Sequence, residues 1–453
     1  MSKIVLPKIT KPRQRHHVKK SVKKSSPKFE PSNGDEEVFL SAEAAYQKGF
    51  AENQGLFMLL GAFYRNSAIS WIHFLTFLLS ASFLSALFFQ TAFLFKDNLA
   101  RLYETLHWIV IIVGMIVQVL VYTSVKSPYD RIFTKFGNTL YKYEITDDET
   151  ASEINRLRKR GDWEKSLICK VFTGMLYSLS VCFGLFLPVI DIITGEFFTP
   201  QQSNGILTGI PCIIWVPYTI DPNSVIIARV IILVWQMYMG FTIINSIIAL
   251  ETTAICIGHR LFFEFQILAK TLNRFEIRAQ AAFKKSIENG NETSISQDDF
   301  YCLSLRDSVK HHHTLLEIAG DYMAIFFYPE VVVLVGSIFV ICLSALSIVS
   351  DIPLMAKAVF IVFTLSELAN VFVLCYYGQI LNDAHEMVDL ALYDSNWTNH
   401  IRQVRHHVII MSHRLRIPLT LTAAGFVPAN LITFTQVVKS AFSYFNILQA
   451  LKS

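Results

Sequence analysis

Uncharged polar side chains at helical spacing run along the last apolar stretch of the chain, Asn430–Leu451. They recur every three or four residues and so share one face of a helix: Thr433, Gln436, Ser440 and Ser443. Aliphatic residues continue the same face toward the end of the stretch: Ile447, Ala450 and Leu451. We interpret this face as the lining of an ion pore, with an aliphatic constriction that excludes ions by dewetting.

This polar face has a second interpretation. Small polar residues also mediate packing between membrane helices, and spacing alone does not separate the two roles. One helix cannot enclose a pore, so the pore interpretation requires several subunits around an axis.

Apolar and aromatic side chains lie in the halves of four other spans that we expect on the extracellular side. A cavity with such a lining would hold a small hydrophobic ligand by dispersion and shape. Ordinary core packing would use the same residue types. The candidate ligand positions are Trp108, Ile111, Ile112, Val181, Gly184, Pro188, Val230, Val234, Phe360 and Phe363.

Ionisable residues inside apolar spans are rare and usually functional. Arg229 and Glu330 lie near span ends, where the side chain can reach the membrane surface. Glu367 lies near the middle of a span and must face protein or water, and Lys439 lies in the last span.

Sequence motifs of common enzymes are absent: there is no GxxxxGK[ST], GxGxxG, HExxH or GxSxG. His311, His312 and His313 are adjacent on an expected helix and point in three directions. We therefore predict surface histidines and no metal site. The sequence predicts a protein that is not an enzyme and uses no cofactor.

The chain has 453 residues, of which 52% are hydrophobic and 17% charged, with a mean hydropathy of +0.40. About 20 apolar residues cross a bilayer. We predict an all-α membrane protein with seven spans at Ile69–Phe95, Leu106–Val125, Leu167–Ile190, Ser224–Leu250, Met323–Val349, Met355–Leu381 and Asn430–Leu451.

Lys and Arg are distributed unequally between the loops. There are 12 before the first span, nine in 126–166 and eight in 251–321, against two in 96–105 and none in 191–223. The positive-inside rule then places the N-terminus in the cytoplasm and the C-terminus outside. G-protein-coupled receptors have the opposite orientation, so no G protein is expected as a partner.

The segment 251–321 is expected to form cytoplasmic helices. Apolar residues at helical spacing continue from the fourth span: Leu261, Phe265, Leu268, Leu272 and Phe275. A turn at 289–291 and a second helix follow. We interpret these helices as an assembly domain; helices lying on the membrane surface are the alternative.

The predicted division of the chain has six parts. A basic, disordered tail attracted to anionic lipid comes first, and nucleic acid is not expected as its partner. Four spans with the ligand pocket follow, then a cytoplasmic anchor segment, two further spans, a second anchor segment and the pore helix. The bounds are 1–40, 41–250, 251–321, 322–381, 382–429 and 430–453.

The C-terminal third resembles the insect odorant receptor family. The matching residues are Cys375-Tyr376-Tyr377-Gly378-Gln379, Trp397, Met411, Arg414, Pro418, Ala424-Gly425 and Ser443-Tyr444-Phe445. The resemblance implies a tetrameric, ligand-gated, non-selective cation channel with one odorant pocket per subunit. It places the outer gate at Ile447 and Leu451 and two pocket aromatics at Phe360 and Phe363.

The resemblance also bears on the type of subunit. The family's co-receptor has a long insertion between spans four and five and a glutamine where Ala450 stands here. We therefore expect a ligand-binding receptor, in a homotetramer or with a co-receptor, in the plasma membrane of a sensory neuron dendrite. The expected ligand is a small hydrophobic odorant. The alternatives are a gustatory-type receptor channel and a secondary transporter.

Overall fold

The computed structural model describes residues 68–124, 126–137, 140–199, 205–217, 220, 224–288, 296–352 and 354–452. The predicted basic tail at 1–40 and the predicted turn at 289–291 lie outside these ranges. Regular structure in the described residues is helical apart from two short hairpins.

Six described helices are long and apolar enough to cross a membrane. In lipid every backbone polar group needs a partner within its own segment, so apolar runs of this length fold as helices. The helices are α3 (Ala68–Leu94), α4 (Leu99–Ser124), α6 (Asp148–Val181) with its continuation into α7 (Leu187–Ile193), α8 (Val225–Asn273), α11 (Pro329–Val349) and α12 (Leu354–Asp394).

The last predicted span is also a helix, α14 (Leu431–Lys452). It is long enough to cross a membrane but does not reach the apolarity of the other six. Its polar side chains account for the difference. The seven predicted spans therefore correspond to six strongly apolar helices and one mixed helix.

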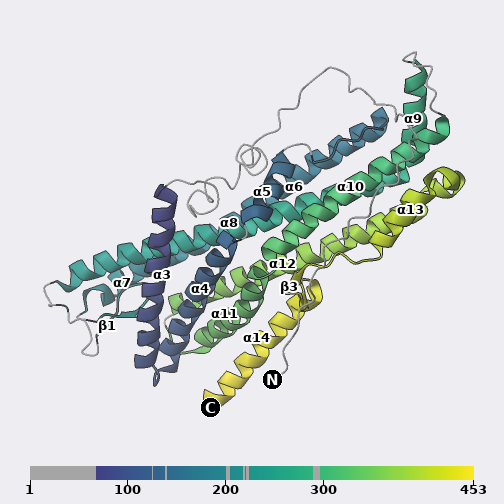
Figure 1. Ribbon diagram of the computed structural model, residues 1–453. Helices are drawn as coiled ribbons and strands as arrows, with labels where there is room; N and C mark the ends of the chain where they lie inside the picture. The colour runs from purple at the N-terminus through teal and green to yellow at the C-terminus, as the bar shows by residue number, and fades with distance from the viewer. Residues whose placement is uncertain are drawn as a thin grey trace, which may run out of the picture. The chain divides into compact units, whose positions relative to one another are not determined.

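The membrane helices pack in a connected bundle. α8 lies against α6 and α12, α11 lies between α4 and α12, and α3 packs on α4. α14 packs on α11 and α12 (Figure 1). A π-helical turn at Cys182–Phe186 joins α6 to α7.

Helix α8 continues far beyond a bilayer. Its 49 residues correspond to about 74 Å, against about 30 Å of hydrocarbon. The helical continuation predicted through Leu261, Phe265, Leu268 and Leu272 is confirmed, and all four side chains are buried. The domain boundaries proposed after residues 250 and 381 fall inside α8 and α12, which run on without interruption.

Shorter helices pack around the extended ends of α8 and α12. They are α5 (Lys126–Gly137), α9 (Phe275–Glu288), α10 (Gln297–Phe326), a 3-10 turn at Asn396–His400 and α13 (Ile401–Leu415). Helix α10 contacts α5, α8, α9 and α13. Its N-terminus is fixed by a capping box between Ser296 and Asp299.

The start of the fifth span differs from the prediction. Met323 belongs to α10, and a break at Phe327 and Tyr328 separates α10 from α11. Pro329 explains the break, because it lacks the N–H that would continue the helix and is favoured in a first helical turn.

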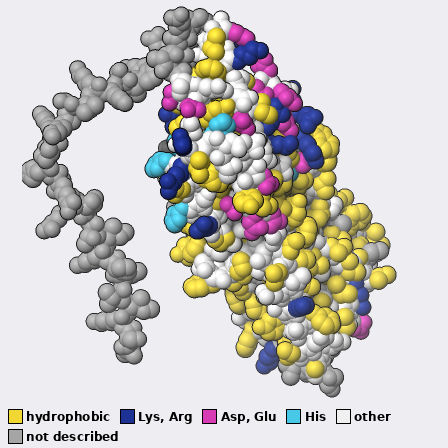
Figure 2. Space-filling model, turned by 90° about the vertical axis from the view of Figure 1, so that its right-hand side faces the viewer, with side chains coloured by type: hydrophobic (Ala, Val, Ile, Leu, Met, Phe, Trp, Pro, Cys, Tyr) yellow, Lys and Arg dark blue, Asp and Glu magenta, His cyan; other side chains and the backbone are white. Residues whose placement is uncertain are grey.

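Charged and hydrophobic side chains occupy different ends of this bundle. Figure 2 shows Lys, Arg, Asp and Glu gathered around one end and hydrophobic side chains over the other. In Figure 1 the charged end carries α9 and α13, and the opposite end carries β1 (Ile206–Leu207). This separation matches a protein that crosses a membrane and extends into water on one side.

Two hairpins complete the fold. β1 pairs with β2 (Ile214–Trp215), after a 3-10 turn at Glu196–Phe198. β3 (Thr422–Ala423) pairs with β4 (Val427–Pro428) directly before α14. Gly425 in the second hairpin has φ +75°, a conformation that glycine adopts without a Cβ clash.

Candidate functional site

A cavity of about 160 Å³ lies among α3, α4, α6, α8, α11 and α12. Most of its lining is aliphatic or aromatic, including Phe88, Trp108, Met115, Met239 and Phe363. An apolar cavity of about 150 Å³ in another protein binds benzene. The size and lining therefore suit a single-ring aromatic or a short-chain volatile molecule.

Trp108 and Phe363 form the aromatic part of this lining. Their ring centroids are 5.3 Å apart in an edge-to-face arrangement. The His107 ring packs edge-to-face against Phe363 at 5.1 Å and against Trp108 at 5.4 Å. The aromatic wall is thus held by neighbouring rings as well as by its own helices.

The structure brings together part of the predicted ligand set. Trp108, Ile111, Ile112 and Phe363 line the cavity. The other predicted positions do not line it: Val181, Gly184, Pro188, Val230, Val234 and Phe360. Val181, Val230 and Val234 are exposed on the outside of the single chain, Pro188 is buried, and Phe360 is buried against His107.

The segment that contains β1 and β2 is hydrogen-bonded to α3 and α8 beside the cavity. Gln236 on α8 exchanges two hydrogen bonds with the backbone of Cys212, at 2.7 and 3.1 Å, and both residues line the cavity. The backbone N–H of Trp215 donates to Thr91 on α3 at 2.8 Å. These bonds hold the segment against α3 and α8.

Arg229 also holds this segment, which corrects the prediction that it reaches the membrane surface. Its side chain is fully buried and donates to the backbone oxygens of Phe197 at 2.6 Å and Thr208 at 2.8 Å. A guanidinium has five donors in a fixed plane, so it can satisfy several loop carbonyls at once.

Polar groups line another part of the cavity. Glu251 on α8 and Glu367 on α12 line it together with Ser337, Gln118 and Asn370. Glu367 was predicted to face protein or water; it lines the cavity and accepts a hydrogen bond from the Ser337 hydroxyl. Glu251 was missed because the fourth span was ended at Leu250. The uncharged continuation Thr252–Gly258 could have revealed that the span continues.

Glu330 corrects a second prediction. It was expected to reach the membrane surface, but it is 1% exposed at the start of α11. Neither of its carboxyl oxygens has a hydrogen-bond partner among the described residues.

The face of α14 that is turned away from the bundle carries most of the predicted pore residues. Gln436, Ser443, Ile447 and Ala450 are exposed on the single chain, and Ser440 is half-buried. Thr433 is buried, and its hydroxyl donates to the backbone oxygen of Pro428 at 2.6 Å. Leu451 lies in the helix, but its side chain is outside the described set.

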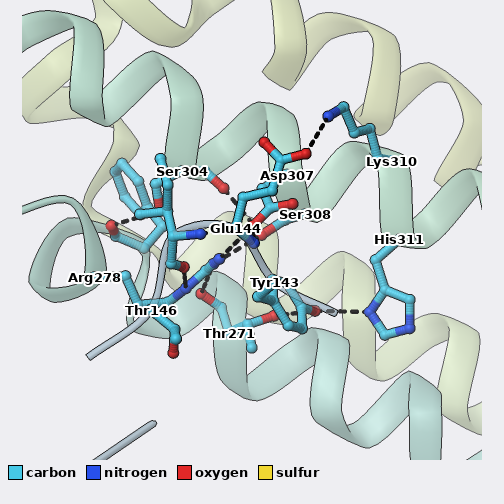
Figure 3. A network of polar contacts seen from close by, with 12 residues as sticks. Tyr143, Glu144, Thr146, Thr271, Arg278, Ser304, Asp307, Ser308, Lys310 and His311 are labelled. Atoms are coloured by element: carbon cyan, nitrogen blue, oxygen red, sulfur yellow. Dashed lines mark hydrogen bonds and ion pairs between the residues drawn. The ribbon is translucent and has the colours of Figure 1, made fainter. Parts of the chain in front are cut away.

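A network of polar contacts joins the helices at the charged end of the bundle (Figure 3). Arg278 on α9 and Asp307 on α10 are both buried and form an ion pair at 3.3 Å. Arg278 also donates to the backbone oxygen of Ile145 at 2.9 Å and lies over the Tyr143 ring at 4.5 Å. The segment before α6 is thereby fixed to α9 and α10.

The three adjacent histidines, His311, His312 and His313, lie in this part of the structure, and the prediction that all three are surface residues was wrong. His311 and His312 are buried, and only His313 is exposed. His311 accepts or donates a hydrogen bond with the Tyr143 hydroxyl at 2.7 Å. Burial lowers the pKa of His311 despite the opposing effect of Glu264, and burial lowers the pKa of His312 to about 3.

The sequence profile of the 7tm odorant receptors matches residues 98–442. The match covers well over half of the chain and includes the cavity-lining parts of α4, α6, α8, α11 and α12. The chain belongs to the 7tm odorant receptor family.

Curated relatives agree with this assignment. Odorant receptor 85b of Drosophila melanogaster is 23% identical over 217 residues, which cover 48% of this chain and 51% of that one. Odorant receptor 85c of the same species is 24% identical over 147 residues, which cover 32% and 38%. The match thus spans about two fifths to half of the length of these relatives.

Solved structures show the same fold over a longer range. The insect olfactory receptor OR5 from Machilis hrabei, in complex with eugenol, superposes with a TM-score of 0.69 at 13% identity. The superposition covers 90% of this chain and 99% of that one. A second structure of OR5 gives a TM-score of 0.66. This odorant receptor therefore has the olfactory receptor fold. Its family and its six membrane-length helices identify it as a multi-pass membrane receptor and not an enzyme.

Proposed function

We propose that this odorant receptor is a ligand-gated, non-selective cation channel opened by small hydrophobic volatile molecules. The observation that carries the proposal is the mostly apolar cavity among the membrane helices, with Trp108, Ile111, Ile112 and Phe363 in its wall. A related receptor is solved with eugenol, a small aromatic molecule. The cavity of about 160 Å³ is large enough for a single aromatic ring.

The pore is proposed to form from several copies of α14. Gln436, Ser443 and Ile447 are exposed on the single chain, so this part of the helix is available to line a central axis. A tetramer, either homomeric or with a co-receptor subunit, would place four copies of Ile447 in one ring. In this arrangement the segments 251–321 and 382–429 form the cytoplasmic anchor of the assembly. The proposed location of the protein is the plasma membrane of sensory neuron dendrites.

Two other functions would use the same fold differently. A gustatory-type receptor would take sugars or bitter compounds, but most of this lining is aliphatic or aromatic, which favours a ligand with an apolar body over a sugar. A secondary transporter usually has internal repeats with broken helices near the membrane centre. The odorant-gated channel is the better supported function.

Whole-cell recording separates these functions. Cells that express the chain with and without a co-receptor are exposed to a panel of single-ring aromatic and short-chain odorants, including eugenol. Odorant-evoked cation current is the expected result. Odorant uptake without current would support a transporter, and current evoked only by sugars would support a gustatory-type receptor.

A further inference from the structure

The polar part of the cavity contains a carboxyl group without a partner. Glu251 is 9% exposed, lines the cavity and makes no hydrogen bond or ion pair with the described residues. Glu367 lines the same cavity and accepts one hydrogen bond, from the Ser337 hydroxyl. The side-chain oxygen of Asn370 is buried in this lining and also has no partner among the described residues.

No positively charged side chain among the described residues forms an ion pair with these acids. Glu251, Glu367 and the neighbouring Glu330 form no ion pair with a described Lys, Arg or His. A carboxylate removed from water without a donor or a counter-charge carries a large desolvation cost. Such a carboxyl is more stable with its proton bound. An amine that enters the cavity can take up this proton and pair with the resulting carboxylate, so that both charges are compensated.

We propose that the cavity binds a small amphipathic amine, whose protonated amino group lies between Glu251 and Glu367. The proposal rests on the proposed function as an odorant receptor and specifies the chemistry of its ligand. The apolar body of the amine packs against Trp108 and Phe363. An ammonium group has three donors, and Glu251, Glu367 and the Asn370 oxygen supply acceptors for them.

An inorganic cation is a poorer occupant of the same space. A hard cation takes six or more oxygen ligands, but most of the lining of this cavity is apolar. An amine uses both parts of the lining, because its charged head meets the carboxyl groups and its body meets the aromatic wall. This combination of groups favours the amine.

The test uses three probes with the same ring: benzylamine, benzyl alcohol and toluene. The full chain is purified in detergent, and binding at pH 7 is measured from the ligand-dependent rise of its unfolding temperature. Benzylamine is expected to bind tenfold to a hundredfold more tightly than toluene, roughly the contribution of hydrogen bonds between charged groups. Benzyl alcohol should fall between them.

Matched carboxyl-to-amide variants locate the effect. Glu251→Gln and Glu367→Gln should each remove most of the preference for benzylamine and leave toluene binding unchanged. Glu104→Gln is the control, because Glu104 pairs with Arg101 at 2.9 Å and does not line the cavity. It should keep the preference intact.

The outcomes separate this inference from the proposed function. If benzylamine binds no better than toluene, or if no probe binds, the amine site is overturned. The same holds if both glutamine variants keep the preference while folded at wild-type yield. If the preference depends on Glu251 and Glu367 but the odorant panel in whole-cell recording evokes no current, the amine site stands and the channel function fails.

Discussion

Phe363 and Phe360 lie one helical turn apart on α12 but have different surroundings. Phe363 lines the cavity and packs on Trp108, whereas Phe360 is buried against His107 away from it. Both residues are phenylalanines on the same helix. Substituting each one in turn therefore distinguishes the loss of a ligand contact from the loss of a core contact.

We predict that Phe363→Ala weakens the response to aromatic odorants tenfold to a hundredfold, because truncation removes about 1–3 kcal/mol of ligand contact. Dose–response curves of odorant-evoked current measure the shift, and surface labelling controls for folding. Phe360→Ala should instead lower surface expression and leave the half-maximal concentration of the expressed receptor unchanged. Equal shifts in both variants would contradict the assignment of Phe363 to the ligand wall.

His312 is predicted to make the charged end of the bundle sensitive to acid. Its ring stacks on His385 at 5.7 Å, and the nearby charges of Arg414 and the other histidines add to the effect of burial. The pKa is about 3 in the folded protein and about 6.5 ordinarily. Between these values the unfolded chain binds a proton that the folded chain does not, so stability falls as pH falls.

The test compares two neighbouring histidines. Unfolding temperatures of the purified protein are measured from pH 7.5 down to pH 5. His312→Phe keeps an aromatic ring and should lessen the acid-induced decrease, to which the buried His311 also contributes, whereas the exposed His313→Gln should follow the wild type. An unchanged pH profile in His312→Phe would remove His312 as a source of the decrease.

At the level of the site, residue type was predictable but orientation was not. The sequence located Trp108, Ile111, Ile112 and Phe363, because apolar and aromatic residues clustered in the expected halves of the spans. It could not determine which side of each helix faces the cavity: Val230 and Val234 lie on α8 but point away from it. That choice depends on the rotation of each helix, which packing between distant segments sets.

At the scale of elements, Gly378 allows the segment that leads into α14 to lie close to α12. A Cβ at Gly378 would lie 2.0 Å from the backbone oxygen of Ala429, two residues before the helix starts. The Cys375–Gln379 motif thus has a packing role in addition to marking the family. Only glycine leaves room for this contact.

We predict that Gly378→Ala destabilises the protein by about 1–3 kcal/mol, because the Ala429 backbone must move. Gly320→Ala on α10 is the control, since a Cβ there meets nothing within 4 Å. It should stabilise the helix by up to about 1 kcal/mol. Thermal unfolding of both variants tests whether the two changes in stability have opposite signs. A Gly378→Ala protein with wild-type stability would disprove the close contact between Gly378 and Ala429.

Helix α14 offers another pair of neighbours with different roles. Leu448 packs on a cluster that contains Tyr103, Cys342 and Leu343, whereas Ile447 is 56% exposed on another face. In the proposed assembly Ile447 forms a closed aliphatic ring around the pore. Water and ions are excluded from such a ring until it widens.

We predict that Ile447→Ser raises the resting current without ligand, because polar side chains admit water into the constriction. Leu448→Ser should instead reduce surface expression without a leak, since it removes a packing contact. Patch-clamp recording with surface labelling measures both. Wild-type resting current in an Ile447→Ser receptor at normal surface density would remove Ile447 from the gate.

The helices were more predictable than their ends. Long apolar runs predicted helices, and α3 begins one residue from the expected start at Ile69. The extent of α8 and α12 was underestimated, because their water-exposed continuations use the same helix with ordinary polar residues. The break before Pro329 was overlooked, although proline is the physical reason for it.

At the scale of the whole molecule, orientation in the membrane rests on charge. The loops 126–166 and 251–321 hold nine and eight Lys and Arg, whereas 191–223 holds none. The structure shows that the charged helices gather at one end of the bundle (Figure 2). The positive-inside rule assigns that end to the cytoplasm and the β1–β2 end to the outside.

Glycosylation gives a direct test of this orientation, because the modification occurs only on segments that reach the secretory lumen. The native sequons at Asn291 and Asn396 lie on the predicted cytoplasmic side and should remain unmodified. Gln201→Asn creates an acceptor before Gln202 and Ser203, on the predicted outer side. It should add one glycan, visible as a gel shift that a glycosidase reverses. A Gln201→Asn protein without a glycan, together with a modified Asn291, would invert the orientation and with it the proposed access of odorants to the cavity.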